Sequence, residues 1–421
     1  MILSIIVIIL IGLVTYYHYN QGLFTAAISL GCALIATFVA FGYYENMLNV
    51  LGAGKMIDMD ASAMLMLLFG FTYLALRITA DAVVPGNVSF PLYVDRAGAA
   101  ILGLMAGVLA VGTFAVATQL MPFGATIGMA SKYEIADRPS LIIPANVYGG
   151  NSRSKDSGIQ NELVSNNLDP ANASNLWVPA DNVVLSIVKI ASAGGLGDAQ
   201  SFADIHPDLT SEAFANRLGA DFSTNRVALN TPKLKMVDVS GVYTTGPVQA
   251  ADAEISDIRP DRKALTLPGK IDSVLVLRVD LQDSVADKDG YARVTPSSVR
   301  LVIDGVTYHP AGTMAKSDVI ALNRLDDQIP IVMHGKGRGA DFAFVLPKAV
   351  TSRIIAPGKT TADAGKTKAD AGFFELKLFG RVDLGNRPVA TYTGPTEVQQ
   401  VLYKPVSPLG QLLGLAPKKP E

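Results

Sequence analysis

The residues that could support hydrolysis are three histidines in the polar part of the chain, His206, His309 and His334. A chymotrypsin-like hydrolase needs a histidine base, an aspartate that orients it and a serine on a tight glycine turn, in that chain order. The nearest motif, Lys-Asp-Ser-Gly at 155–158, precedes all three histidines. Gly-x-Ser-x-Gly is also absent. We therefore predict no catalytic residue and no enzyme activity.

Metal and nucleotide motifs are equally incomplete. The segment 204–208, Asp-Ile-His-Pro-Asp, fits a capped turn better than a cation site. The segment 287–290 lacks the first and last ligands of an EF-hand loop, and 357–360 lacks the first glycine of a P-loop. Cys32 is the only cysteine, which excludes cysteine-based zinc and iron–sulfur sites. We predict neither a metal nor a cofactor.

The polarity of the chain changes near residue 121, and this boundary separates an apolar part from a polar part. Hydrophobic residues make up 49% of the chain and charged residues 17%. No charged residue occurs before Glu45, and few follow before residue 121. Apolar segments at 2–19, 23–44, 61–80 and 97–120 predict four transmembrane helices, the first an anchor rather than a cleaved signal peptide. The rest of the chain has balanced charge, so nucleic acid is not an expected partner.

Small residues recur every fourth position on the fourth span, at Ala99, Gly103 and Gly107. Small residues let helices approach closely in lipid. We expect them to pack the third and fourth spans within one bundle. An interface for self-association or for another envelope protein is the alternative.

The loop between the third and fourth spans lies between Arg77 and Arg96, whereas the preceding loop has only Lys55 as a basic residue. Basic residues near spans are retained in the cytoplasm. This pattern predicts that the N-terminus and the C-terminal domain both lie outside the cytoplasm.

Residues 94–107 read Val-Asp-Arg-Ala-Gly-Ala-Ala-Ile-Leu-Gly-Leu-Met-Ala-Gly, with the acid–base pair at Asp95 and Arg96. Together with the turn at Gly22, which precedes a span rich in glycine and alanine, this stretch resembles the colicin V production protein (CvpA) family over residues 1–121. The first glycine, Gly98, comes one residue earlier than in the family pattern. The resemblance implies a bacterial inner-membrane protein linked to colicin V production and envelope homeostasis.

The polar part divides into three regions. Residues 122–232 are expected to be mixed helix and loop, with helices at 181–193 and 211–218 and a loop at 202–207. Residues 233–405 are expected to form a β-sandwich-like extracytoplasmic domain, because short alternating runs are separated by polar turns. Its strands are expected at 233–243, 271–281, 298–308, 341–346 and 373–384. Residues 406–421 are expected to be an extended tail.

Three classes of function follow from this organisation. The first is a non-enzymatic CvpA-type membrane protein with a binding or scaffold domain outside the cytoplasm. The alternative is a transporter or channel component, although no Lys, Arg, Asp or Glu lies mid-span. A membrane-anchored hydrolase lacks its catalytic constellation. The lipid bilayer is the one partner that the sequence itself requires.

Overall fold

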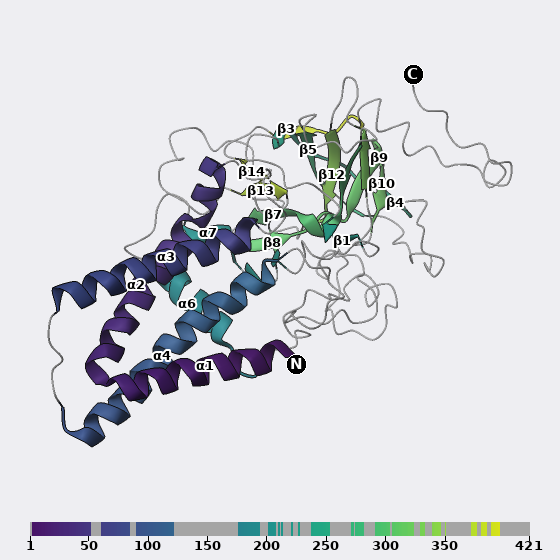
Figure 1. The fold of residues 1–421 in the computed structure, drawn as a ribbon. Helices are drawn as coiled ribbons and strands as arrows, with labels where there is room; N and C mark the ends of the chain where they lie inside the picture. The colour runs from purple at the N-terminus through teal and green to yellow at the C-terminus, as the bar shows by residue number, and fades with distance from the viewer. Residues whose placement is uncertain are drawn as a thin grey trace.

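The computed structural model describes two bodies joined at one end, a helical bundle and a strand-rich domain (Figure 1). The described residues are 2–51, 60–84, 90–121, 176–193, 201–207, 209–210, 212–213, 220–221, 226–227, 237–252, 271–272, 274–281, 291–303, 305–323, 329–332, 339–346, 350, 372–376, 380–384 and 389–395. The expected tail at 406–421 and most of the expected helix at 211–218 lie outside them.

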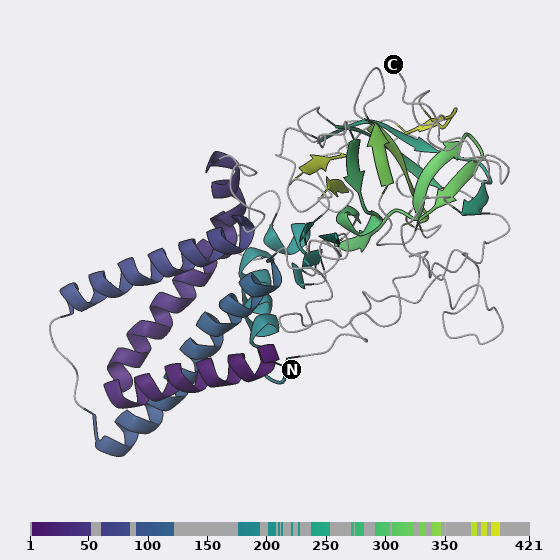
Figure 2. The same cartoon turned by 45° about the vertical axis from the view of Figure 1, so that its right-hand side comes forward.

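Four helices form the bundle: α1 (Ile2–Gln21), α2 (Leu23–Leu51), α3 (Asp60–Val83) and α4 (Leu92–Gln119). Each is long and apolar enough to cross a membrane, as the sequence predicts. An even number of passes brings the start of α1 and the end of α4 to the same end of the bundle, next to the strand-rich domain (Figures 1 and 2). The second helix continues beyond the expected end at residue 44, and this extension carries Glu45.

The small residues of α4 face α1. A Cβ atom built on Gly103 would lie 2.6 Å from the Cβ of His18, and one on Gly107 would lie 3.4 Å from the Cβ of Val14. The expectation that these glycines join the third and fourth spans is therefore wrong in its choice of partner. The physical reason is that α1 is the helix whose backbone approaches this face of α4 closely.

Two further helices cover the bundle at the end next to the strands. Helix α6 (Ala180–Ala193) confirms the expected helix, and its Val184, Leu185 and Val188 pack against apolar side chains of α2 and α4. A short helix α7 (Phe202–Ile205) replaces the expected loop at 202–207. It forms because Ser201 and Asp204 make a capping box that satisfies its first backbone amides.

The strand-rich domain contains a seven-stranded sheet in the order β15-β3-β5-β12-β9-β10-β4. A four-stranded sheet has the order β14-β13-β7-β8, and two-stranded pairs are formed by β11 with β6 and by β1 with β2. The strands are β1 (Ala220–Asp221), β2 (Arg226–Val227), β3 (Val237–Thr244), β4 (Gln249–Asp252), β5 (Leu275–Leu281), β6 (Tyr291–Val294), β7 (Val299–Ile303), β8 (Val306–Tyr308), β9 (Gly312–Lys316), β10 (Val319–Leu322), β11 (Ile329–Val332), β12 (Gly339–Phe344), β13 (Phe373–Leu376), β14 (Gly380–Asp383) and β15 (Val389–Thr391). A 3₁₀ turn, η4 (Pro296–Ser298), precedes β7.

The two larger sheets share a core. Leu277 of β5 and Phe342 of β12 belong to the same buried cluster as Leu301 of β7 and Phe374 of β13. Val276 of β5 and Ala343 of β12 face the other way, into a second cluster with residues of β9 and β10. Two packed sheets with alternating buried residues confirm the sandwich-like architecture. The second cluster explains why β5 and β12 are apolar on both faces.

Candidate functional site

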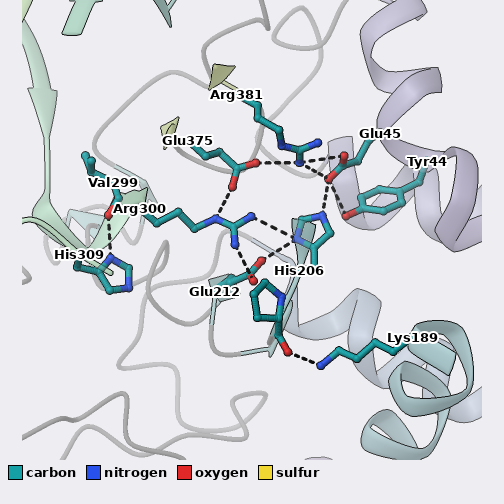
Figure 3. A network of polar contacts seen from close by, with 11 residues as sticks. Tyr44, Glu45, Lys189, His206, Glu212, Val299, Arg300, His309, Glu375 and Arg381 are labelled. Carbon is teal, nitrogen blue, oxygen red and sulfur yellow. Dashed lines mark hydrogen bonds and ion pairs between the residues drawn. The ribbon is translucent and has the colours of Figure 1, made fainter. Parts of the chain in front are cut away.

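A row of alternating charges crosses three strands of the four-stranded sheet. Glu375 of β13 lies opposite Arg300 of β7 on one side and Arg381 of β14 on the other. Because side chains alternate along a strand, Phe374 and Leu376 enter the core while Glu375 lies on the opposite face. The register of the sheet thus places Arg–Glu–Arg in one line, on the face toward the bundle (Figure 3).

The bundle and the segment after α6 supply three more groups to this face. Glu45 comes from the end of α2, His206 directly follows α7, and Glu212 lies six residues further along. The ring of Phe202 positions this segment, with its centroid 5.6 Å from that of Phe41 on α2 and 5.0 Å from that of His206. The Nζ of Lys189 on α6 also donates to the carbonyl of Pro207.

These six side chains close into a ring in which acids and bases alternate; we call it the junction ring. His206 contacts Glu45 through Nε2 and Glu212 through Nδ1, each at 2.7 Å. The other carboxylate oxygen of Glu212 lies 2.7 Å from Nη1 of Arg300, whose Nε donates to Glu375.

Arg381 completes the ring. Its Nη2 lies 3.0 Å from Glu375 and 3.2 Å from Glu45 (Figure 3). Each of the six groups therefore has an oppositely charged neighbour on both sides. The ring passes through a membrane helix, the α7 segment and three strands.

The protonation of His206 decides the charge balance of the junction ring. Burial alone would lower the pKa of its imidazole, but the carboxylates of Glu212 and Glu45 raise that pKa to about 9. The side chain is then an imidazolium at neutral pH, and both ring nitrogens donate. The charges cancel, three positive against three negative.

The arginines of the ring keep their charge. Burial would lower the pKa of Arg300, but Glu212 and Glu375 raise it. The same balance, with Glu375 and Glu45 as the nearby acids, raises the pKa of Arg381. Both guanidinium groups also lie over the ring of Phe373, at 5.6 Å for Arg300 and 5.4 Å for Arg381. This ring of charge can hold two bodies together, because removal of one member leaves a buried charge uncompensated.

His309 lies beside the junction ring without joining it. Its Nδ1 is 2.8 Å from the carbonyl oxygen of Val299 and donates to it. Burial lowers the pKa of its imidazole, so this side chain is neutral. Substitution of His309 is therefore a suitable control for substitution of the charged His206.

No family model, curated protein or solved structure matches this chain. Within the residues that the structure describes, no group of histidine, cysteine and acidic side chains has the arrangement of a metal site. The role proposed for the junction ring therefore rests on the geometry of the ring.

Two of the residues singled out from the sequence meet at the opposite end of the bundle. The backbone amide of Leu23 donates to Asp95 at 2.8 Å, so the carboxylate of α4 caps the start of α2. Gly22 adopts φ +97°, and a Cβ there would lie 2.9 Å from the same carboxylate. This contact explains both the glycine and the acid of the predicted motif.

The other predicted residues are also distant from the junction ring in the fold. The guanidinium of Arg96 lies 5.6 Å from the centre of the Tyr19 ring. Arg77 pairs with Asp81 at 3.1 Å and lies 3.3 Å from the hydroxyl of Ser29. Ala99 is fully buried in the bundle. All of these groups serve packing between helices.

Sequence reasoning did not single out the junction ring. Arg300 and Glu375 alternate with apolar neighbours, a pattern that normally indicates a solvent-facing position. His206 matches no complete catalytic motif and lies in a segment that fits a capped turn, and Glu45 directly follows the expected end of a span at residue 44. The available indication was Glu45 itself, because an acid directly after an apolar run without charge is costly unless it has a partner.

Proposed function

We propose that this chain is a non-enzymatic bacterial inner-membrane protein of the CvpA type that supports toxin production or export, or envelope homeostasis. In this proposal the strand-rich domain lies outside the cytoplasm and acts as a binding or scaffold module. The observation that carries the proposed scaffold role is the junction ring, which joins the domain to the membrane helix α2 through Glu45. A scaffold needs such a fixed orientation, because its docking surface must keep a constant position relative to the membrane.

The chemistry of the ring supports a structural role. His206 has acids on both sides of its imidazole and is 1% exposed, so neither nitrogen is free to abstract a proton from a substrate. Glu375 is completely buried between two arginines. The groups of this ring that could act as acid or base are thus engaged with one another.

A pull-down in mild detergent tests the proposed scaffold role. Full-length protein with a C-terminal tag is captured from solubilised envelopes, and bound proteins are quantified against a tagged, unrelated four-span protein. We expect enrichment of export or envelope-assembly proteins. Enrichment of cytoplasmic proteins alone would contradict the proposal.

A second experiment tests the proposed lack of enzyme activity. A fluorophosphonate probe, which labels activated serines, is applied to the purified chain. We expect no labelled serine. Labelling that disappears on substitution of any histidine would establish a hydrolase instead.

A further inference from the structure

Helix α6 lies beside α4 and begins below the level at which α4 ends (Figure 1). A Cβ atom built on Gly112 of α4 would collide with the carbonyl oxygen of Ala180, the first residue of α6. At a rise of about 1.5 Å per residue, Gly112 lies roughly 10 Å before the end of α4 at Gln119. The start of α6 is therefore level with an apolar span, although α6 belongs to the polar part of the chain.

Helix α6 crosses the bundle instead of extending one of its helices. Leu176 and Ala180 belong to a buried cluster with Val7 of α1. Val188, two turns further along, belongs to another cluster with Phe41 of α2. Because its start packs beside α1 and its later turns pack beside α2, the helix runs across the membrane helices near the junction ring. A helix in the plane of a membrane surface has this orientation.

Large apolar side chains are exposed on the outer side of this segment. Trp177, directly before α6, is 58% exposed, and Val183 and Ile190 are 41% and 75% exposed. Val183 and Ile190 are two turns apart and share a face of the helix. The exposed polar residues beside them, Asn182 and Ser186, are small and uncharged. This combination suits the boundary between acyl chains and headgroups, where tryptophan is also enriched.

The two charged residues of α6 are both engaged with the protein. The carboxylate of Asp181 is buried and accepts a hydrogen bond from Nε2 of Gln119 at 3.0 Å. The Nζ of Lys189 donates to the carbonyl oxygen of Pro207, next to the junction ring. A helix side that faces water normally carries charged residues. The outer side of α6 carries none, so its composition favours lipid over water as its surroundings.

We propose that α6 is an interfacial helix whose exposed residues Trp177, Val183 and Ile190 contact membrane lipids in the leaflet next to the strand-rich domain. The chain returns to the membrane after its fourth span, and α6 holds the strand-rich domain close to the lipid surface. This inference rests on the proposed crossing of the membrane by the bundle. It is independent of the scaffold role proposed for the strand-rich domain.

The test uses the unaltered chain, because Trp177 is its only tryptophan. The full-length protein is placed in nanodiscs of phosphatidylcholine whose acyl chains carry bromine either near the headgroup or near the terminal methyl group. Bromine quenches tryptophan fluorescence on contact. We expect the shallow bromine to cause a larger loss of fluorescence than the deep bromine, and dissolved iodide to cause little loss.

Two control variants in a Trp177→Phe background calibrate the depth. Leu13→Trp puts a tryptophan at an exposed position in the middle of α1, and the deep bromine should quench it most. Thr391→Trp puts one at an exposed position on the edge strand β15, and iodide alone should quench it.

Quenching of Trp177 by iodide and by neither brominated lipid would overturn the proposal. So would stronger quenching by the deep bromine, because it would place Trp177 in the middle of the membrane. Protection from all three quenchers would show that a protein surface covers α6, which also contradicts the proposal. If Leu13→Trp does not respond to brominated lipid either, the bundle does not cross the membrane, and the proposed membrane location fails together with this inference.

Discussion

His206 holds a proton between two carboxylates, so its titration sets a pH limit on the junction ring. Its pKa is about 9 in the folded protein and 6.5 as the ordinary value. A pKa raised by folding contributes stability that is fully present below pH 6.5 and is lost as pH rises through 9. The junction should therefore weaken in alkaline conditions.

This expectation is tested by comparing the wild type with His206→Gln. The variant removes the cation shared by Glu45 and Glu212, which keep only Arg381 and Arg300 as partners, and we expect a loss of about 3–5 kcal/mol in unfolding free energy at pH 6. The difference from the wild type should narrow as pH rises to 10, as followed by fluorescence of the single tryptophan, Trp177. The control is His309→Gln, which replaces a neutral imidazole. A difference that stays constant with pH would contradict the assigned proton.

Gly22 offers a second test at the residue scale. Gly22→Ala introduces a side chain at φ +97° and against Asp95, so we expect a loss of about 1–2 kcal/mol in unfolding free energy. Gly12→Ala is the matched control, because a Cβ at Gly12 meets no atom within 4 Å. Equal effects of the two substitutions on denaturant unfolding would show that the turn does not need glycine.

At the scale of elements, the coupling of α2 to β14 can be measured by a double-mutant cycle. Glu45→Gln and Arg381→Gln each break the 3.2 Å contact, and we expect a coupling of about 1–3 kcal/mol between them. The control cycle pairs Glu45 with Arg278, which is bound to Asp341 inside the strand-rich domain. Additive effects in the first cycle would remove the basis for a rigid junction.

The packing of α4 on α1 can be trapped by a disulfide. In a background with Cys32→Ser, Val14→Cys together with Gly107→Cys should cross-link on oxidation, because the two Cβ positions are 3.4 Å apart. This separation is close to the usual range for disulfides, about 3.5–4.5 Å. Gly31→Cys with Gly107→Cys is the control, since a Cβ at Gly31 meets no atom within 4 Å. A cross-link in the control alone would refute this helix pairing.

At the scale of the whole molecule, the proposed topology has the strand-rich domain outside the cytoplasm. Arg77 and Arg96 lie toward the end of the bundle away from the junction ring, which supports a cytoplasmic position for that end. We expect alkaline phosphatase fused after Glu421 to be active and a green fluorescent protein fusion exported through Sec to be dark. The reverse pattern would place the domain in the cytoplasm.

The sequence by itself determined the elements with strong local patterns. Apolar runs without charge set the four long helices, and alternating apolar runs set β3, β5, β7, β12 and β13. The β7–β8 hairpin, where Gly305 has φ +71°, lies within the expected strand region 298–308. These features depend on neighbouring residues, so composition and period are sufficient to find them.

Only the tertiary structure decided which surfaces meet. Glycines at every fourth position indicate that a helix packs closely against a neighbour. They do not indicate which neighbour. In the structure Gly103 and Gly107 pack against α1. Likewise, Glu45 and Arg381 are 336 residues apart in the chain, and no local pattern relates them. A buried charge is stabilised by whichever opposite charge the fold brings near it. The junction ring therefore became visible only when the sheet register and the end of α2 were placed together.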